Sequence, residues 1–165
     1  MRLTLPFTEA RELALQGGAL PPIVRSASCV GATIRAEIDL RAVPGAPLAV
    51  RALAAVAPIV RVDATFRAFE QGRVTFELTI WAAAVPVHRL LNQLTGVLNG
   101  ALRGRGLPDG LVVVHQGLRG EPVAVVDLQA AVALRADGVT LTDFALADGA
   151  VELEASIAGF ALREL

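Results

Sequence analysis

Hydrophobic and polar residues alternate with a period of two along four segments of the chain. In each segment the apolar side chains fall on one face and the charged or hydroxyl-bearing ones on the other, which predicts strands with one dry and one solvated face. Gly72 and Gly149 stand just before the third and fourth segments, where glycine favours a tight hairpin turn. The pattern predicts antiparallel strands over residues 32–41, 60–68, 73–80 and 151–157.

Three further segments carry apolar residues at the spacing of an α-helix. The longest spans about residues 86–103, with Pro86 at its first position and one side nearly free of charge. A shorter helix is predicted over residues 8–17, with Thr8 as its N-cap. The third, residues 47–57, is apolar on almost every side, which predicts that it is buried on most sides.

Residues 123–134 fit two interpretations, a strand or a helix with Asp127 as its N-cap, and periodicity does not separate them.

Taken together, the segments predict an α+β fold, in which an antiparallel sheet packs on amphipathic helices. A chain of 165 residues is long enough for one compact domain with its own core. We therefore expect a single domain over residues 1–165.

Similar sequences recur about 75–80 residues apart, which suggests two repeat units over residues 1–80 and 81–165. Residues 45–50 are echoed by 120–125, and residues 72–77 by 149–154. A duplication would give two pseudo-symmetric units with the order strand, helix, strand, helix, hairpin, sharing one core. The alternative is chance similarity, because the chain is rich in alanine, valine and leucine.

Composition narrows the classes of function. The chain is 54% hydrophobic and 19% charged, with a formal net charge of −1, so no general field attracts nucleic acid or an anionic membrane. The longest uncharged apolar run is residues 52–60, too short for a membrane span. The first nine residues lack the apolar segment of a secretory signal, which favours a cytoplasmic location, the alternative being the mature part of an exported protein.

The sequence contains few residues that could serve in catalysis or bind a metal. All basic residues are arginine, so lysine chemistry is absent, and the single cysteine, Cys29, allows no internal disulfide. His88 and His115 have no third ligand or nucleophile at a suitable spacing. The sequence therefore predicts no catalytic residue, no metal site and no cofactor, and it offers neither the basic patch nor the aromatic platform of a nucleic-acid site.

Small residues four apart, Asn92, Gly96 and Gly100, lie opposite the leucine stripe of the predicted helix over residues 86–103. Such a stripe lets another backbone approach closely. It has two interpretations, packing against the sheet or contact with a second subunit.

The long alternating strands, the amphipathic helix with its uncharged polar side, and the segments 125–128 and 139–155 resemble the TULIP-type lipid-binding proteins of bacteria. The resemblance covers about the C-terminal two-thirds of the chain. It implies a long, curved antiparallel sheet wrapped around a helix, with an apolar tunnel for a lipid tail. It assigns no individual functional residue.

These observations lead to the hypothesis that the protein binds an apolar ligand, such as a lipid or a fatty-acyl chain, between sheet and helix without catalysis. The alternative is an assembly module that buries its apolar surplus in a homo-oligomer. The residues that would line the cavity could also simply fill a dry core. They are Phe66, Phe76, Ile80, Leu90, Leu94, Leu98 and Leu153.

Overall fold

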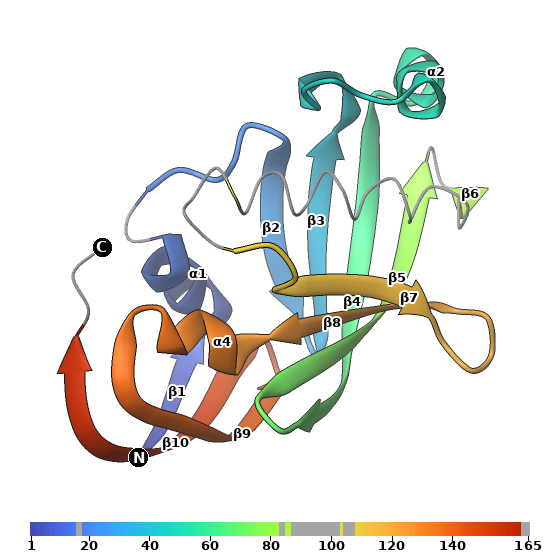
Figure 1. The fold of residues 1–165 in the computed structure, drawn as a ribbon. Coiled ribbons are helices and arrows are strands. Elements are labelled where there is room, and N and C mark those ends of the chain that lie inside the picture. The colour runs from blue at the N-terminus through green and yellow to red at the C-terminus, as the bar shows by residue number, and fades with distance from the viewer. Residues whose placement is uncertain (16–17, 83–84, 87–102, 104–107, 163–165) are drawn as a thin grey trace.

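A computed structural model describes residues 1–15, 18–82, 85–86, 103 and 108–162. Over these residues the chain forms two antiparallel sheets with three α-helices (Figure 1). The predicted α+β class and the antiparallel pairing of the strands are confirmed.

The larger sheet curls into a half-barrel, and the strand direction turns strongly between β2 and β8 (Figure 1). Its strand order is β2-β3-β4-β5-β8-β7, and β6 pairs with β5. The strands are β2 (Val24–Val30), β3 (Thr33–Asp39), β4 (Ile59–Glu70), β5 (Arg73–Ala82), β6 (Val85–Pro86), β7 (Val112–Gln116) and β8 (Pro122–Asp127).

The smaller sheet has the order β1-β10-β9, so the first strand of the chain pairs with the last strand (Figure 1). Its strands are β1 (Arg2–Pro6), β9 (Ala136–Ala147) and β10 (Ala150–Leu162). The helix α1 (Phe7–Leu15) follows β1, and α4 (Leu128–Ala133) connects β8 to β9. The 3-10 helix η1 (Leu40–Ala42) and α2 (Leu48–Val56) connect β3 to β4.

One glutamine ties the β4–β5 turn to the smaller sheet. The backbone N–H of Gln129 in α4 donates to the carbonyl of Gly72 at 3.0 Å. Its side chain donates to the Val139 carbonyl at 3.0 Å and accepts from the Leu141 N–H at 2.8 Å. Because a Cβ at residue 72 would collide with the Gln129 side chain, glycine is needed there for this close approach.

Both predicted hairpin turns form, with glycine at a positive φ angle. Gln71 and Gly72 have φ angles of 51° and 80°, and Asp148 and Gly149 have 51° and 74°. Two consecutive positive φ angles define the type I′ turn, whose twist matches that of the flanking strands.

The four predicted strands correspond to β3, β4, β5 and β10, with two notable differences. The first ends at Asp39 and not at residue 41, because the Asp39 carboxylate accepts a hydrogen bond from the Arg41 N–H at 3.0 Å and caps η1. The fourth continues to Leu162. In the ambiguous segment both interpretations are partly right, since β8 ends at Asp127, which caps α4 through the Ala130 N–H.

The helix predictions need three corrections. The first helix begins at Phe7, so Thr8 lies inside it and is not its N-cap. Pro86 belongs to β6, where it pairs with Trp81 and does not begin a helix. The segment 47–57 forms α2 as expected, but it is not buried on most sides. Only Val50 is buried, and Leu48 and Val56 are 74% and 84% exposed.

Residues 2–82 follow the order strand, helix, two strands, helix, two strands, and residues 112–162 follow the order two strands, helix, two strands. The correspondence between residues 45–50 and 120–125 does not hold, because Leu48 begins a helix whereas Pro122 begins a strand. The similarity between residues 72–77 and 149–154 does not decide the question, so the duplication stays a prediction.

Candidate functional site

The inner face of the larger sheet is apolar along each cross-strand row from β3 to β5. Directly paired residues in an antiparallel sheet project to the same face. The rows therefore form one continuous apolar surface. They are Ile34–Ala64–Leu78, Ala36–Val62–Ile80 and Ile38–Val60–Ala82.

Burial differs along this surface. On β5 every second residue from Val74 to Ala82 is buried, and Ile80 is only 1% exposed. The neighbouring residues in the middle of β3 and β4 remain half-buried, although they pack against the same core. The half-buried group consists of Ile34, Ala36, Val62 and Ala64.

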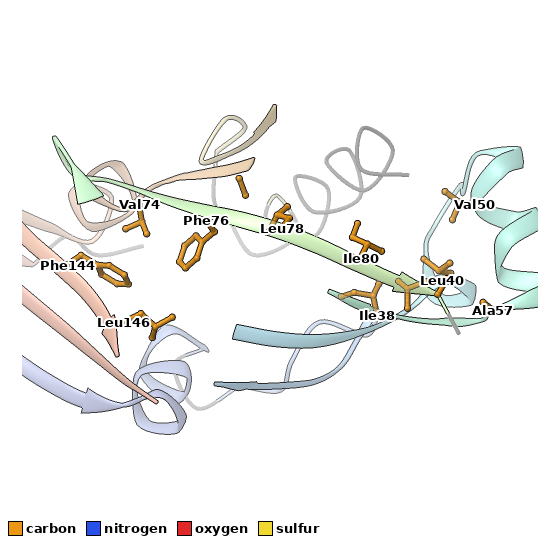
Figure 2. Packing of buried hydrophobic residues seen from close by; sticks show 13 residues of the cluster. Ile38, Leu40, Val50, Ala57, Val74, Phe76, Leu78, Ile80, Phe144 and Leu146 are labelled. Atoms are coloured by element: carbon orange, nitrogen blue, oxygen red, sulfur yellow. The ribbon is translucent and has the colours of Figure 1, made fainter. Parts of the chain in front are cut away.

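An aromatic cluster closes one end of the surface, where the smaller sheet meets the larger one. The ring of Phe66 lies 6.3 Å from Phe76, edge to face, and 5.4 Å from Phe144 of β9. Phe69 lies 6.4 Å from Phe144. Figure 2 shows Phe144 and Leu146 against the Val74 end of β5.

The residues around α2 close the other end. Val50 and Leu40 are 1% and 3% exposed, and they lie beside the Ile80 end of β5 (Figure 2). The apolar face is therefore bounded by packed clusters at both ends, with the half-buried group between them.

Four of the predicted lining residues fall in this region. Phe66, Phe76 and Ile80 belong to the inner face of the larger sheet, and Leu153 of β10 pairs with Phe144 and packs against the same core. The other predictions lie outside the described residues: Leu90, Leu94 and Leu98 of the lining, and Asn92, Gly96 and Gly100 of the interface stripe.

Sequence reasoning missed Phe144 and Leu146. In β9 the apolar side chains follow one phase at Val139 and Leu141 and the opposite phase at Phe144 and Leu146. A β-bulge explains the change, because Asp143 pairs with Glu154 whereas Leu141 pairs with Ala155. This change of phase in the sequence was the signal that could have identified Phe144 and Leu146 as core residues.

The site has little capacity for ionic or nucleophilic chemistry. Within the part of the chain that the structure describes, no polar or charged residue is buried, and no group of three or more His, Cys, Asp and Glu could hold a metal. Burial raises the pKa of the Cys29 thiol, which disfavours the reactive thiolate. The arrangement can offer a ligand mainly apolar contact.

One carboxyl near α2 is strongly perturbed. The Arg41 side chain donates to both oxygens of Asp39, at 2.9 and 2.8 Å. This hydrogen-bonded guanidinium lowers the pKa of Asp39 from its ordinary 3.8 to about 2. Because the folded-state pKa is depressed, the pair stabilises the fold above about pH 4 and loses this effect as the pH falls through 2.

We expect Arg41→Met to return the pKa of Asp39 from about 2 toward 3.8. The measurement is an NMR titration of the side-chain carboxyl carbon. Arg51→Met is the control, since Arg51 lies in the neighbouring α2 and makes no hydrogen bond to Asp39 in the described structure. An unchanged Asp39 titration in Arg41→Met would contradict the assignment.

Comparisons of the chain with protein-family models, with curated proteins and with solved structures find no match. Among the described residues, no helix has the length and hydropathy to cross a membrane.

Proposed function

We propose that the protein binds an apolar ligand, such as a lipid or a fatty-acyl chain, on the inner face of the larger sheet and without catalysis. The half-buried group in the middle of this face carries the proposal. In a filled core, Val62 and Ala64 would be as well covered as their partners Ile80 and Leu78 on β5. They retain exposed apolar surface that a ligand can cover.

The expected driving force is burial of hydrocarbon. Each methylene removed from water contributes about 0.8 kcal/mol. The rows from Ile34 to Ala82 present no polar side chain that would lose water without a partner. A chain-like ligand running along β3 and β4 between Phe66 and Ile38 would use this surface best.

We also propose that the chain contains an internal duplication and that its fold is related to that of the TULIP-type proteins. One pairing between the halves is compatible with a duplication, because β1 of the first predicted unit pairs with β10 of the second. In this proposal the apolar face is one wall of the tunnel that the resemblance implies.

We expect Ala64→Leu to weaken ligand binding about tenfold or more, equivalent to about 1.4 kcal/mol, because the larger side chain occupies the surface meant for the ligand. The measurement is titration of the 165-residue chain with a dansylated fatty acid, followed by dansyl fluorescence. Thr65→Leu is the matched control, because Thr65 is the next residue of β4 and projects to the opposite face.

Native mass spectrometry of the purified full chain adds a second readout, a co-purified lipid on the monomer. Equal affinities for Ala64→Leu and the unmodified chain would contradict the proposed site. No binding of the dansylated fatty acid by the unmodified chain, together with no co-purified lipid, would overturn the function.

The second candidate function is homo-oligomeric assembly. The exposure of Leu48 and Val56 on α2, at 74% and 84%, favours it, because large apolar side chains on one short helix suit a subunit contact. A stable, ligand-free dimer or larger oligomer in the same mass spectra would favour assembly over ligand binding.

A further inference from the structure

The opposite face of the larger sheet carries a polar hollow of about 300 Å³. This volume is at the lower end of the range for small-molecule sites. Strands β2, β3, β4 and β5 supply its lining, which consists of Val30, Thr33, Arg35, Asp63, Thr65, Thr79 and Trp81.

Strand register brings these side chains together. Arg35 pairs with Asp63 and Asp63 with Thr79, while Thr33 pairs with Thr65. These residues alternate with the apolar rows, so they project to the face opposite the proposed apolar site. The two sites share strands but not side chains.

Charged and aromatic groups of the lining contact Arg61, which lies beside the hollow. The Asp63 carboxylate accepts a hydrogen bond from Arg35 Nε at 3.1 Å, and Arg61 Nε lies 3.4 Å from the same oxygen. The guanidinium of Arg61 lies over the Trp81 ring, 5.2 Å from its centroid. Because the two lining charges, Arg35 and Asp63, pair with each other, the lining has no net charge.

Two nitrogen donors beside the hollow lack acceptors. Arg61 Nε and Trp81 Nε1 are buried, and neither makes a hydrogen bond within the described part of the chain. Arg61 Nε lies near Asp63 Oδ1, but the N–H is not aligned for a hydrogen bond. A buried donor without an acceptor costs about 1–3 kcal/mol. Surrounding protein atoms cover both nitrogens, so a ligand in the hollow meets the lining side chains and not these two atoms.

Hydroxyl groups complete the lining. The Thr33 and Thr65 hydroxyls share one hydrogen bond of 2.9 Å, which leaves each with further capacity to donate or accept. Thr79 adds a third hydroxyl to the lining. Paired donors and acceptors, an uncharged lining overall and an indole ring are the features that recognise the hydroxyls and the apolar face of a sugar ring.

We propose that this hollow binds a neutral, polyhydroxylated ligand of about the size of one sugar ring. Asp63 and the threonine hydroxyls bind its hydroxyl groups, Arg35 donates to its oxygens, and Trp81 contacts its C–H face. A ligand of net negative charge is disfavoured, because it would lie against the Asp63 carboxylate and compete with it for Arg35, the cation of the lining.

The chain contains one tryptophan and no tyrosine, so its tryptophan emission reports on this hollow alone. The experiment titrates the full chain with glucose, galactose, mannose and N-acetylglucosamine, and separately with sodium citrate at matched ionic strength. We expect a saturable change in Trp81 emission with at least one sugar, in the millimolar range, and none with citrate.

Thr79→Val is expected to weaken this sugar binding about tenfold, as when a buried hydrogen bond is lost. Thr75→Val is the matched control, on the same strand and face but outside the lining. Circular dichroism checks that both variants fold. No saturable response to any of the four sugars, a response to citrate alone, or an equal loss in both variants would each overturn the proposal.

Discussion

Replacing Phe144 with alanine should lower the free energy of unfolding by about 3–5 kcal/mol, the usual cost of truncating a buried phenylalanine. The Phe144 side chain is 8% exposed and comes from the smaller sheet, yet its ring contacts Phe66 and Phe69 of β4 in the larger sheet. Truncation would leave a cavity at the junction of the sheets. Urea unfolding followed by circular dichroism measures the change.

Two variants control this experiment. Phe144→Leu keeps most of the apolar volume, so it should cost clearly less than Phe144→Ala. Leu162→Ala removes a side chain that is 74% exposed, and we expect a change within about 0.5 kcal/mol. A loss below about 1 kcal/mol for Phe144→Ala would show that the aromatic cluster does not hold the two sheets together.

Replacing Gly138 with alanine should cost about 2–5 kcal/mol, which combines backbone strain with overpacking. Gly138 has a φ angle of 74°, and a Cβ there would collide with the Ala158 carbonyl oxygen and lie 2.8 Å from the Gly159 carbonyl carbon. These atoms belong to β10, next to an irregularity in its pairing with β9. Backbone has to move, because no flexible side chain can give way.

Gly45→Ala separates the two causes. Gly45 has a similar φ angle, 60°, but nothing lies within 4 Å of a Cβ built there. Its substitution should cost only the strain, about 1–2 kcal/mol. Thermal unfolding of both variants gives the comparison. Equal losses would mean that the β9–β10 contact relaxes without cost and that strain alone matters at both glycines.

The two proposed sites lie on opposite faces of the same strands. In β4, Ala64 belongs to the apolar face, while its neighbours Asp63 and Thr65 line the polar hollow. Successive side chains of a strand project to opposite faces, so adjacent residues serve different environments. The sugar titration and the fatty-acid titration therefore test independent sets of side chains.

Alternation made the faces of β3, β4 and β5 predictable, and with them the positions of Phe66, Phe76 and Ile80. The hairpin glycines were predictable for the same local reason, because Gly72 and Gly149 adopt backbone angles that other residues avoid. Asp127 was recognisable as an N-cap from its side chain, although the sequence did not separate the strand before it from the helix after it.

The polar hollow was less accessible to sequence reasoning. Alternation placed Arg35, Asp63 and Thr65 on solvated faces, which is also the pattern of an ordinary sheet surface. The register between strands then brought Asp63 next to Arg35 and placed Trp81 beside Arg61. Such register depends on turns and pairings beyond each strand.

By itself, the sequence determined the strands β3, β4 and β5 and the first part of β10, which faces of those strands are apolar, and where two tight turns occur. These features depend on side-chain periodicity and local backbone preference, which act over a few residues. Only the tertiary structure decided that β1 pairs with β10 and that the apolar helix α2 remains exposed. Pairing and burial depend on contacts between segments far apart in the chain, and local patterns do not encode them.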